Sequence, residues 1–142
     1  MDVKTITDGE FVGWKTWPSE PFEHDSAGPF YLREDDQGMV AAFRAQRKHM
    51  NAGGVVHGGC LMTFADFALF AIAHDSGDEG GYGVTVAFTS EFLSGALEGE
   101  YIEARGEVIG GGKSITFVRG LVTADKRPVL NFSGTIKKRQ KK

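Results

Sequence analysis

Fifteen consecutive residues near the middle of the chain constrain its fold more than any other segment. Residues 59–73 read GCLMTFADFALFAIA, which is apolar on nearly every helical face and carries a single charge, that of Asp66. A helix on a protein surface shows a polar stripe, so this pattern predicts a buried helix that the rest of the chain surrounds. The run is too short to cross a bilayer and has a carboxyl group at its centre, so we expect no membrane segment here.

The segments that would surround this helix have the alternation typical of β-strands. Four such runs lie near residues 82–93, 100–109, 114–124 and 128–137, separated by glycine-rich or Lys/Pro breaks. Before the helix, residues 30–33 and 39–44 flank the turn sequence Asp-Asp-Gln-Gly and predict a hairpin. The order hairpin, helix, meander predicts an α+β fold in which a curved antiparallel sheet wraps a long central helix.

The two ends of the chain are expected to contribute packing and solubility. Phe11, Trp14 and Trp17 stand near helical spacing, which predicts a short amphipathic helix followed by an irregular segment within residues 1–29. We expect this segment to serve packing and not chemistry. The basic tail, residues 137–142, is expected to be a frayed, solvated end.

Length and composition limit the possible classes of protein. The 142 residues suffice for one domain, residues 1–142, and a net charge of −3 argues against a nucleic-acid-binding protein. Cys60 is the only cysteine, so no internal disulfide forms, and the first residues lack the profile of a secretory signal. These features predict a cytoplasmic protein that binds neither nucleic acid nor membrane.

Glycines at the predicted helix start suggest a site for negative charge. The first backbone N–H groups of a helix lack intrahelical acceptors and lie at the positive end of its dipole. Gly58 and Gly59 have no side chain to keep a carbonyl oxygen away from these groups, and His57 immediately precedes them. The alternative is that the glycines only permit a sharp turn and that His57 is a core residue.

Asp66 favours the chemical interpretation. An ionised carboxylate in so apolar a helix costs several kcal/mol unless partners compensate, so we expect a nucleophile or general base. The alternative is a polar face that meets water or a neighbouring N–H group. Eight residues separate Gly58 from Asp66, roughly 12 Å along a helix and roughly 80° around it. One substrate carbonyl cannot contact both, so a shared site requires two copies of the chain and predicts a two-fold dimer.

The sequence NAGGVVHGG at residues 51–59, followed by Asp66, resembles the hotdog-fold acyl-CoA thioesterases of the phenylacetic-acid-degradation (PaaI-like) group. Two later segments agree with that group in order and spacing, GVTV at residues 83–86 and GKS at residues 112–114. The resemblance spans residues 30–137. It implies hydrolysis of an acyl-CoA thioester to a carboxylic acid and CoA, by a homodimer or a dimer of dimers, with no cofactor and no metal.

The resemblance also implies a role for each matching residue. The Gly58 N–H would polarise the thioester carbonyl, and Asp66 of the partner subunit would attack it or activate water. Asn51 would position water or the carbonyl, and His57 would support the loop. Thr85 stands where relatives often carry a serine that orients the attacking water. Phe70 replaces the polar residue of 4-hydroxybenzoyl-CoA thioesterases, which puts that particular substrate in doubt.

The CoA part of the substrate would lie along the dimer surface. Lys113 and Ser114 are the residues expected to bind it, although both also suit an ordinary hairpin turn, whereas Gly59 is expected to bind the substrate at the helix start. Three arginines and the basic tail are further candidates for the phosphates, among which the sequence does not select. These arginines are Arg105, Arg119 and Arg127.

Some features of the sequence also resemble sites for other chemistries. The segment ending in Gly112-Lys113-Ser114 is not a P-loop, because Glu107 replaces the first glycine and β-branched residues follow. Cys60 near a helix start could serve a cysteine hydrolase, but a core cysteine is the more ordinary role. A hotdog enoyl-CoA hydratase or dehydratase and a non-catalytic acyl-CoA-binding module are the remaining alternatives.

Overall fold

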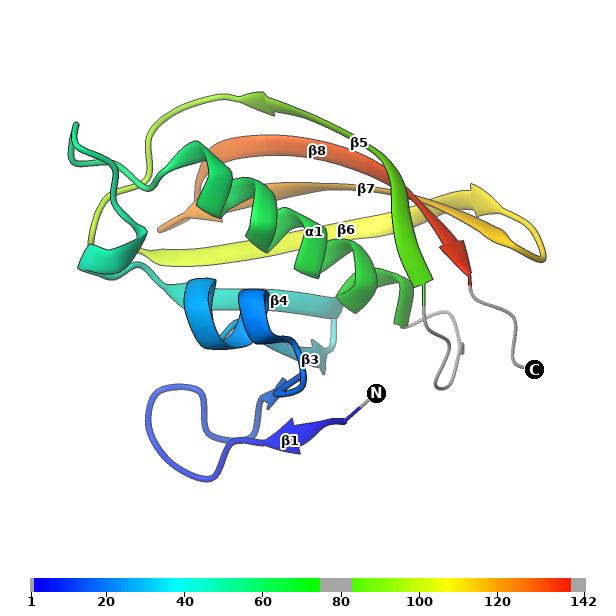
Figure 1. The fold of residues 1–142 in the computed structure, drawn as a ribbon, viewed down its shortest axis with the longest axis horizontal. Helices are drawn as coiled ribbons and strands as arrows, with labels where there is room; N and C mark the ends of the chain where they lie inside the picture. Colours follow the sequence, from blue (N-terminus) through cyan, green and yellow to red (C-terminus); the bar gives the residue numbers. More distant parts are fainter. Residues whose placement is uncertain (1, 75–82, 139–142) are drawn as a thin grey trace.

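The computed structural model describes residues 2–74 and 83–138 and consists of one antiparallel sheet wrapped around a single long helix (Figure 1). The long helix is α1 (Gly58–His74), and two short helical turns precede it, η1 (Pro21–Ala27) and η2 (Arg47–His49). The strands are β1 (Lys4–Thr5), β2 (Lys15–Thr16), β3 (Tyr31–Asp35), β4 (Gly38–Arg44), β5 (Gly83–Phe92), β6 (Tyr101–Gly111), β7 (Ile115–Ala124) and β8 (Arg127–Lys138).

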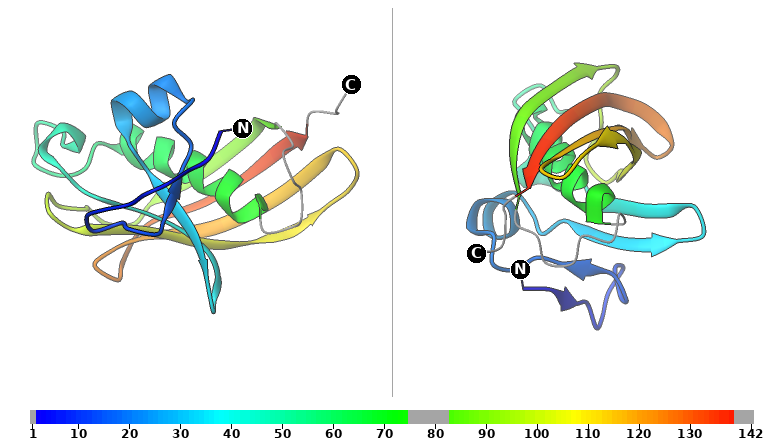
Figure 2. Two further views of the ribbon diagram at one scale, coloured as in Figure 1. Left: turned by 90° about the horizontal axis from the view of Figure 1, so that it is seen from below. Right: turned by 90° about the vertical axis from the view of Figure 1, so that its right-hand side faces the viewer.

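The sheet has eight strands in the order β1-β2-β3-β4-β6-β7-β8-β5, and every neighbouring pair is antiparallel. Viewed end on, β5 to β8 curve around α1 (Figure 2). Register shifts place one extra residue in each of β5, β6 and β8, and these bulges bend and twist the strands locally. The predicted α+β hotdog architecture is confirmed, with its hairpin at β3–β4. The predicted meander holds only for β6, β7 and β8, because β5 pairs with β8 at the edge of the sheet and not with β6.

The core fills the space between α1 and the concave face of the sheet. Phe64, Phe67 and Leu69 of α1 are at most 2% exposed and pack with residues from β4 to β8. The helix approaches the sheet so closely that a Cβ atom on Gly134 of β8 would lie 2.4 Å from Leu69 Cδ1. A glycine is therefore required at this point of the sheet for the helix to lie where it does.

The N-terminal segment differs from the sequence-based prediction. Residues 11–17 form no helix: Phe11 and Trp14 belong to the loop of a β1–β2 hairpin, in which Gly9 and Gly13 have positive φ angles. The helical turn lies later, at Pro21–Ala27. The aromatic residues still serve packing, because Phe11 and Trp14 form a second small cluster with Val40 and Ala42, and Trp17 joins the main core.

The end of the chain is also more ordered than predicted. Lys137 and Lys138, which were assigned to the basic tail, are the last residues of β8 and pair with Val84 and Gly83 of β5. Residues 139–142 lie outside the described residues, as does Asp75, the neighbour of His74 at the end of α1. Within residues 2–74 and 83–138, no helix is both long and apolar enough to cross a membrane.

Candidate active site

One strip of α1 is not covered by the sheet. Met62, Asp66 and Phe70 recur every four residues on this strip, and Met62 is 40% exposed although the remainder of the helix is largely buried. The sequence predicted a helix surrounded on all sides, and this strip is the exception. It is the floor of a groove between η1 and the edge strand β5, and Asp66 lies on that floor.

The groove consists of two cavities with volumes of about 390 and 480 Å³. Both are lined by three acids, Glu20, Glu23 and Asp66, together with Thr85. Around these shared residues the first cavity is lined by Trp17, Phe70, Gly83 and Val84, and the second by Phe22, Met62, Thr63 and Phe88. Polar and apolar surfaces line the first cavity about equally, whereas the second is mainly apolar, so apolar side chains flank an acidic centre.

Asp66 is held in place by a hydrogen bond from the strand beside it. Thr85 Oγ1 donates to Asp66 Oδ1 over 2.5 Å, from the point of β5 where a bulge follows Thr85. Burial raises the pKa of the Asp66 carboxyl, and the bond from Thr85 acts in the opposite direction by favouring the ionised form. Asp66 and Thr85, which the sequence indicates separately as site residues, are thus in contact, and the geometry suits a carboxylate that acts as base or nucleophile.

Glu23, another of the three acids that line the groove, was not recognised from the sequence. Glu23 lies on η1 in the segment assigned to packing, yet it lines both cavities with Asp66. Burial raises the pKa of Glu23 to about 8, and the nearby charges of Glu20 and Asp66 add to the shift. No sequence signal distinguishes Glu23 from an ordinary surface acid, because its position depends on how η1 packs on α1.

The helix start has the free N–H group expected of an anion site. Cys60 and Leu61 donate their N–H groups to the His57 carbonyl, and Gly59 donates to His57 Nδ1 over 2.8 Å. Among the described residues, the Gly58 N–H has no hydrogen-bond acceptor. His57 therefore acts as the cap of α1, and Gly58, not Gly59, presents the available donor.

Space for a side chain at position 58 is limited by an exposed ring, which would have to shift slightly. A Cβ atom there would lie 3.1 Å from Cζ of Phe92, the last residue of β5. Neither cavity at Asp66 includes Gly58 in its lining. Within one chain the two predicted functional groups therefore contribute to different surfaces, in agreement with the separation calculated from the helix geometry.

The loop before α1 is fixed by its own side chains. Asn51 Oδ1 accepts hydrogen bonds from the N–H groups of Gly53 and Val55, at 2.9 and 3.2 Å, so its carbonyl oxygen shapes the loop. The buried His49 bonds to the Ala27 carbonyl through Nε2 at 2.8 Å and accepts from the Gln46 N–H. This histidine connects the loop to η1, a structural role that the sequence did not indicate.

The basic residues considered for CoA are mostly engaged within the chain. Arg105 forms an ion pair with Asp35 at 2.5 Å, and Arg119 with Glu107 at 2.7 Å. Lys113 and Ser114 lie in the turn between β6 and β7, at the end of the molecule opposite the start of α1 (Figures 1 and 2). In one subunit they are therefore distant from Gly58.

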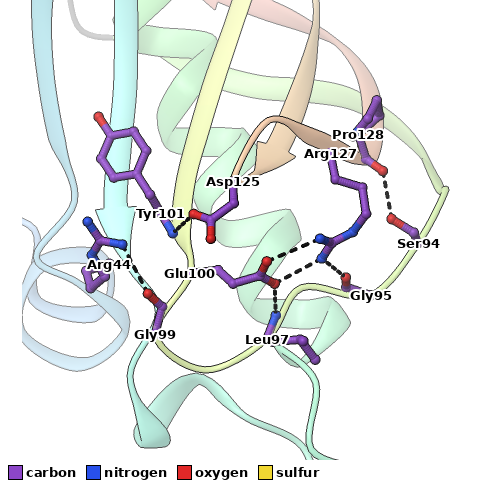
Figure 3. A network of polar contacts seen from close by, with 10 residues as sticks. All are labelled: Arg44, Ser94, Gly95, Leu97, Gly99, Glu100, Tyr101, Asp125, Arg127 and Pro128. Atoms are coloured by element: carbon purple, nitrogen blue, oxygen red, sulfur yellow. Dashed lines mark hydrogen bonds and ion pairs between the residues drawn. The ribbon is translucent and has the colours of Figure 1, made fainter.

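Arg127 is part of a network that fixes the loop before β6 (Figure 3). Its guanidinium group donates to Glu100 at 2.9 Å and to the Gly95 carbonyl at 2.6 Å, while Glu100 also accepts the Leu97 N–H. Beside this network, the Ser94 hydroxyl donates a hydrogen bond to the Pro128 carbonyl at 2.7 Å. Arg127 thus has a structural role, which leaves Lys113 as the better candidate for a phosphate contact.

Cys60 does not have the properties of a nucleophile. Burial raises the pKa of its thiol to about 11, so the reactive thiolate is scarce at neutral pH. The neighbouring His57 ring is already bonded to the Gly59 N–H through Nδ1. The cysteine-hydrolase alternative therefore has no support in the site geometry.

Comparison with known proteins identifies the family of this chain. The family model of the thioesterase superfamily matches residues 53–130, which include α1, β5, β6 and β7. These residues contain Gly58, Asp66 and Thr85 but not Glu23. A proposed esterase of Pseudomonas aeruginosa is 34% identical over 111 residues, which cover 78% of this chain and 83% of that protein.

Solved structures resemble this fold at lower sequence identity. A Bacillus halodurans protein solved with CoA superposes with a TM-score of 0.71 at 20% identity, covering 78% of this chain and 74% of that one. A mutant of the phenylacetic acid degradation protein PaaI from Thermus thermophilus superposes with a TM-score of 0.70 at 22% identity, covering 85% and 100%. These likenesses establish the hotdog fold.

Proposed function

Because the chain belongs to the thioesterase superfamily, we propose that it hydrolyses acyl-CoA thioesters to a carboxylic acid and free CoA. The observation that carries the proposal is the one uncovered strip of α1, on which Asp66 faces a groove flanked by apolar side chains and accepts a hydrogen bond from Thr85. The CoA seen with the Bacillus halodurans protein supports the same class of substrate.

The active unit in this proposal is a homodimer formed through β5. This strand is ten residues long, lies at the edge of the sheet, and exposes apolar side chains, with Val84 58% and Val86 53% exposed. A long apolar edge strand is a template for pairing with another chain. A second copy paired there would cover the strip of α1 that carries Met62, and two-fold symmetry would create two equivalent sites.

The chemical roles follow from the groups available at each surface. The N–H of Gly58 in one subunit would hold the oxygen of the thioester carbonyl and stabilise the tetrahedral oxyanion. Asp66 of the other subunit would remove a proton from the attacking water or attack the carbonyl carbon directly. Lys113, together with Ser114, would meet the CoA phosphates. Collapse of the intermediate would then release the carboxylic acid and CoA.

A screen for free thiol tests this function directly. The purified protein is incubated with short, medium, long and aryl acyl-CoAs, and CoA release is followed with a thiol reagent. We expect release with at least one class and, for Asp66→Asn, a loss of about 10²-fold or more in turnover. The control is Asp36→Asn, which changes an exposed turn residue outside the groove. Normal turnover in Asp66→Asn would refute the assignment.

The same screen distinguishes the two alternative functions. A hydratase or dehydratase would change the absorbance of an enoyl-CoA without releasing thiol, because it acts at the acyl β-carbon. A non-catalytic binding module would retain acyl-CoA without altering it, and Asp66→Asn would not affect its behaviour. Thiol release by the wild-type protein that depends on Asp66 excludes both.

A further inference from the structure

We propose that Glu23, which shares the groove with Asp66, is its acid partner and gives a proton to the departing CoA sulfur. The proposal rests on the thioester hydrolysis argued above and adds a second proton-transfer residue to it. It also assigns a function to the N-terminal segment, which lies outside the region matched by the family model.

The geometry brings the two carboxyl groups to one groove from different elements. Asp66 comes from α1 and Glu23 from η1, and both line each of the two cavities. Contacts on either side hold η1 over the groove: the Trp17 ring packs against the Phe67 ring at 4.9 Å, and His49 Nε2 bonds to the Ala27 carbonyl. The Glu23 side chain is therefore placed by the fold and not by a flexible end.

The two carboxyl groups have unequal partners. Asp66 accepts a hydrogen bond from Thr85, which favours its ionised form, whereas among the described residues no hydrogen-bond donor contacts the side-chain carboxyl of Glu23. The charges acting on Glu23 are those of Glu20, from the adjoining residues, and Asp66, from α1; both are negative. The groove thus favours the ionised form at Asp66, through the bond from Thr85, and the protonated form at Glu23, whose pKa is raised to about 8.

Such a pair of groups with separated pKa values divides the work of base and acid. The attacking water gives a proton to Asp66 as its oxygen bonds to the carbonyl carbon. When the carbon–sulfur bond breaks, Glu23 gives its proton to the sulfur and becomes a carboxylate. The proton on Asp66 then passes through water in the shared groove to Glu23. The net reaction consumes one water and yields the carboxylic acid and CoA thiol, and both residues return to their starting states.

The test compares leaving groups that differ in their need for a proton. An acyl-CoA releases an alkyl thiolate, which is strongly basic, whereas the thiophenyl ester of the same acid releases a weakly basic aryl thiolate. We expect Glu23→Gln to lower kcat for the acyl-CoA by about 10²-fold or more, and to lower kcat for the thiophenyl ester far less. The control is Asp25→Asn, an exposed acid on the same helical turn that lines neither cavity.

The pH dependence provides a second readout that a purely structural role would not alter. Wild-type kcat should fall as the pH rises through about 8, where Glu23 loses its proton, and Glu23→Gln should lack this alkaline limb. Glu20→Gln should move the limb to lower pH, because removal of that negative charge lowers the pKa of Glu23. An unmoved limb in Glu20→Gln would contradict its assignment to Glu23.

Wild-type protein alone keeps the proposal testable if Glu23→Gln does not fold. The ratio of thiophenyl-ester to acyl-CoA turnover should be small near neutral pH and should rise above about pH 8, once the acid is ionised. A ratio that is independent of pH would overturn the proposal, as would an equal loss of both activities in Glu23→Gln. In either case wild-type thiol release would leave the proposed hydrolysis standing, whereas absence of release would refute the hydrolysis itself.

Discussion

Replacing Glu23 with glutamine should make the protein progressively more stable than wild type as the pH rises from about 5 to about 8. In the unfolded chain this carboxyl loses its proton near its ordinary pKa of 4.5, but the folded protein retains the proton until about pH 8. The folded state therefore binds more protons across this interval, so wild-type stability falls as the pH rises. The stability that the folded protein gains by holding the Glu23 proton is fully present below pH 4.5 and is lost by about pH 8.

The size of the effect follows from the difference between the two pKa values. Each pKa unit corresponds to about 1.4 kcal/mol, so the shift from 4.5 to about 8 represents at most about 5 kcal/mol. Because the carboxyl is only partly buried and remains in contact with the groove, solvent screening reduces this to about 2–4 kcal/mol. Glutamine does not ionise, so Glu23→Gln should lack this loss.

Urea unfolding measures the effect without reference to catalysis. Wild type, Glu23→Gln and the exposed-site control Asp36→Asn would be unfolded at intervals from about pH 5 to about pH 8.5, at one protein concentration because a dimer is stabilised by mass action. The difference between Glu23→Gln and wild type should grow with pH, while Asp36→Asn should follow wild type. Parallel stability curves for wild type and Glu23→Gln would refute the raised pKa.

Three further substitutions have definite expected outcomes. Thr85→Val removes the hydrogen bond that favours ionised Asp66, so the acidic limb of kcat/KM should move to higher pH in a pH–rate profile; an unmoved limb would show that the bond does not set this pKa. Cys60→Ser should leave thiol release nearly unchanged, since the thiol is protonated at neutral pH; a loss of orders of magnitude would revive the cysteine mechanism. Gly120→Ala should lower the unfolding free energy by about 1–3 kcal/mol, because its Cβ would lie 2.5 Å from the buried ring of Phe132. The control Gly112→Ala, whose Cβ would have no atom within 4 Å, should leave the unfolding free energy unchanged in the same urea assay.

The fold was largely predictable because its main elements carry strong local patterns. The apolar run at residues 59–73 required burial, and alternating strands of sufficient length followed it, so helix and sheet were predicted nearly to their observed ends. The N-terminal segment was not, because a spacing of three residues suits both a helix and a hairpin loop. Gly9 and Gly13, which adopt positive φ angles, decide in favour of the loop.

The candidate site was predictable where it depends on one element and its neighbour. Asp66 stood out as the lone charge of its helix, and the structure places Thr85 in contact with it. Glu23 was missed because its position is determined by tertiary contacts, above all Trp17 against Phe67, which no local pattern encodes. The arginines considered for CoA could not be ranked either, since their ion pairs depend on strand pairing and register. Arg105 meets Asp35, 70 residues away, and Arg119 meets Glu107 across the β6–β7 hairpin.

The shared site is tested most directly by mixing two inactive variants. Gly58→Pro removes the N–H donor at a helix position where proline is tolerated, and Asp66→Asn removes the base. If each site combines Gly58 of one subunit with Asp66 of the other, a mixed dimer has one intact site and one doubly altered site. Random pairing should then restore about a quarter of wild-type turnover. A mixture in which mass spectrometry detects mixed dimers, but whose activity does not exceed that of the parent variants, would contradict a site built from two subunits.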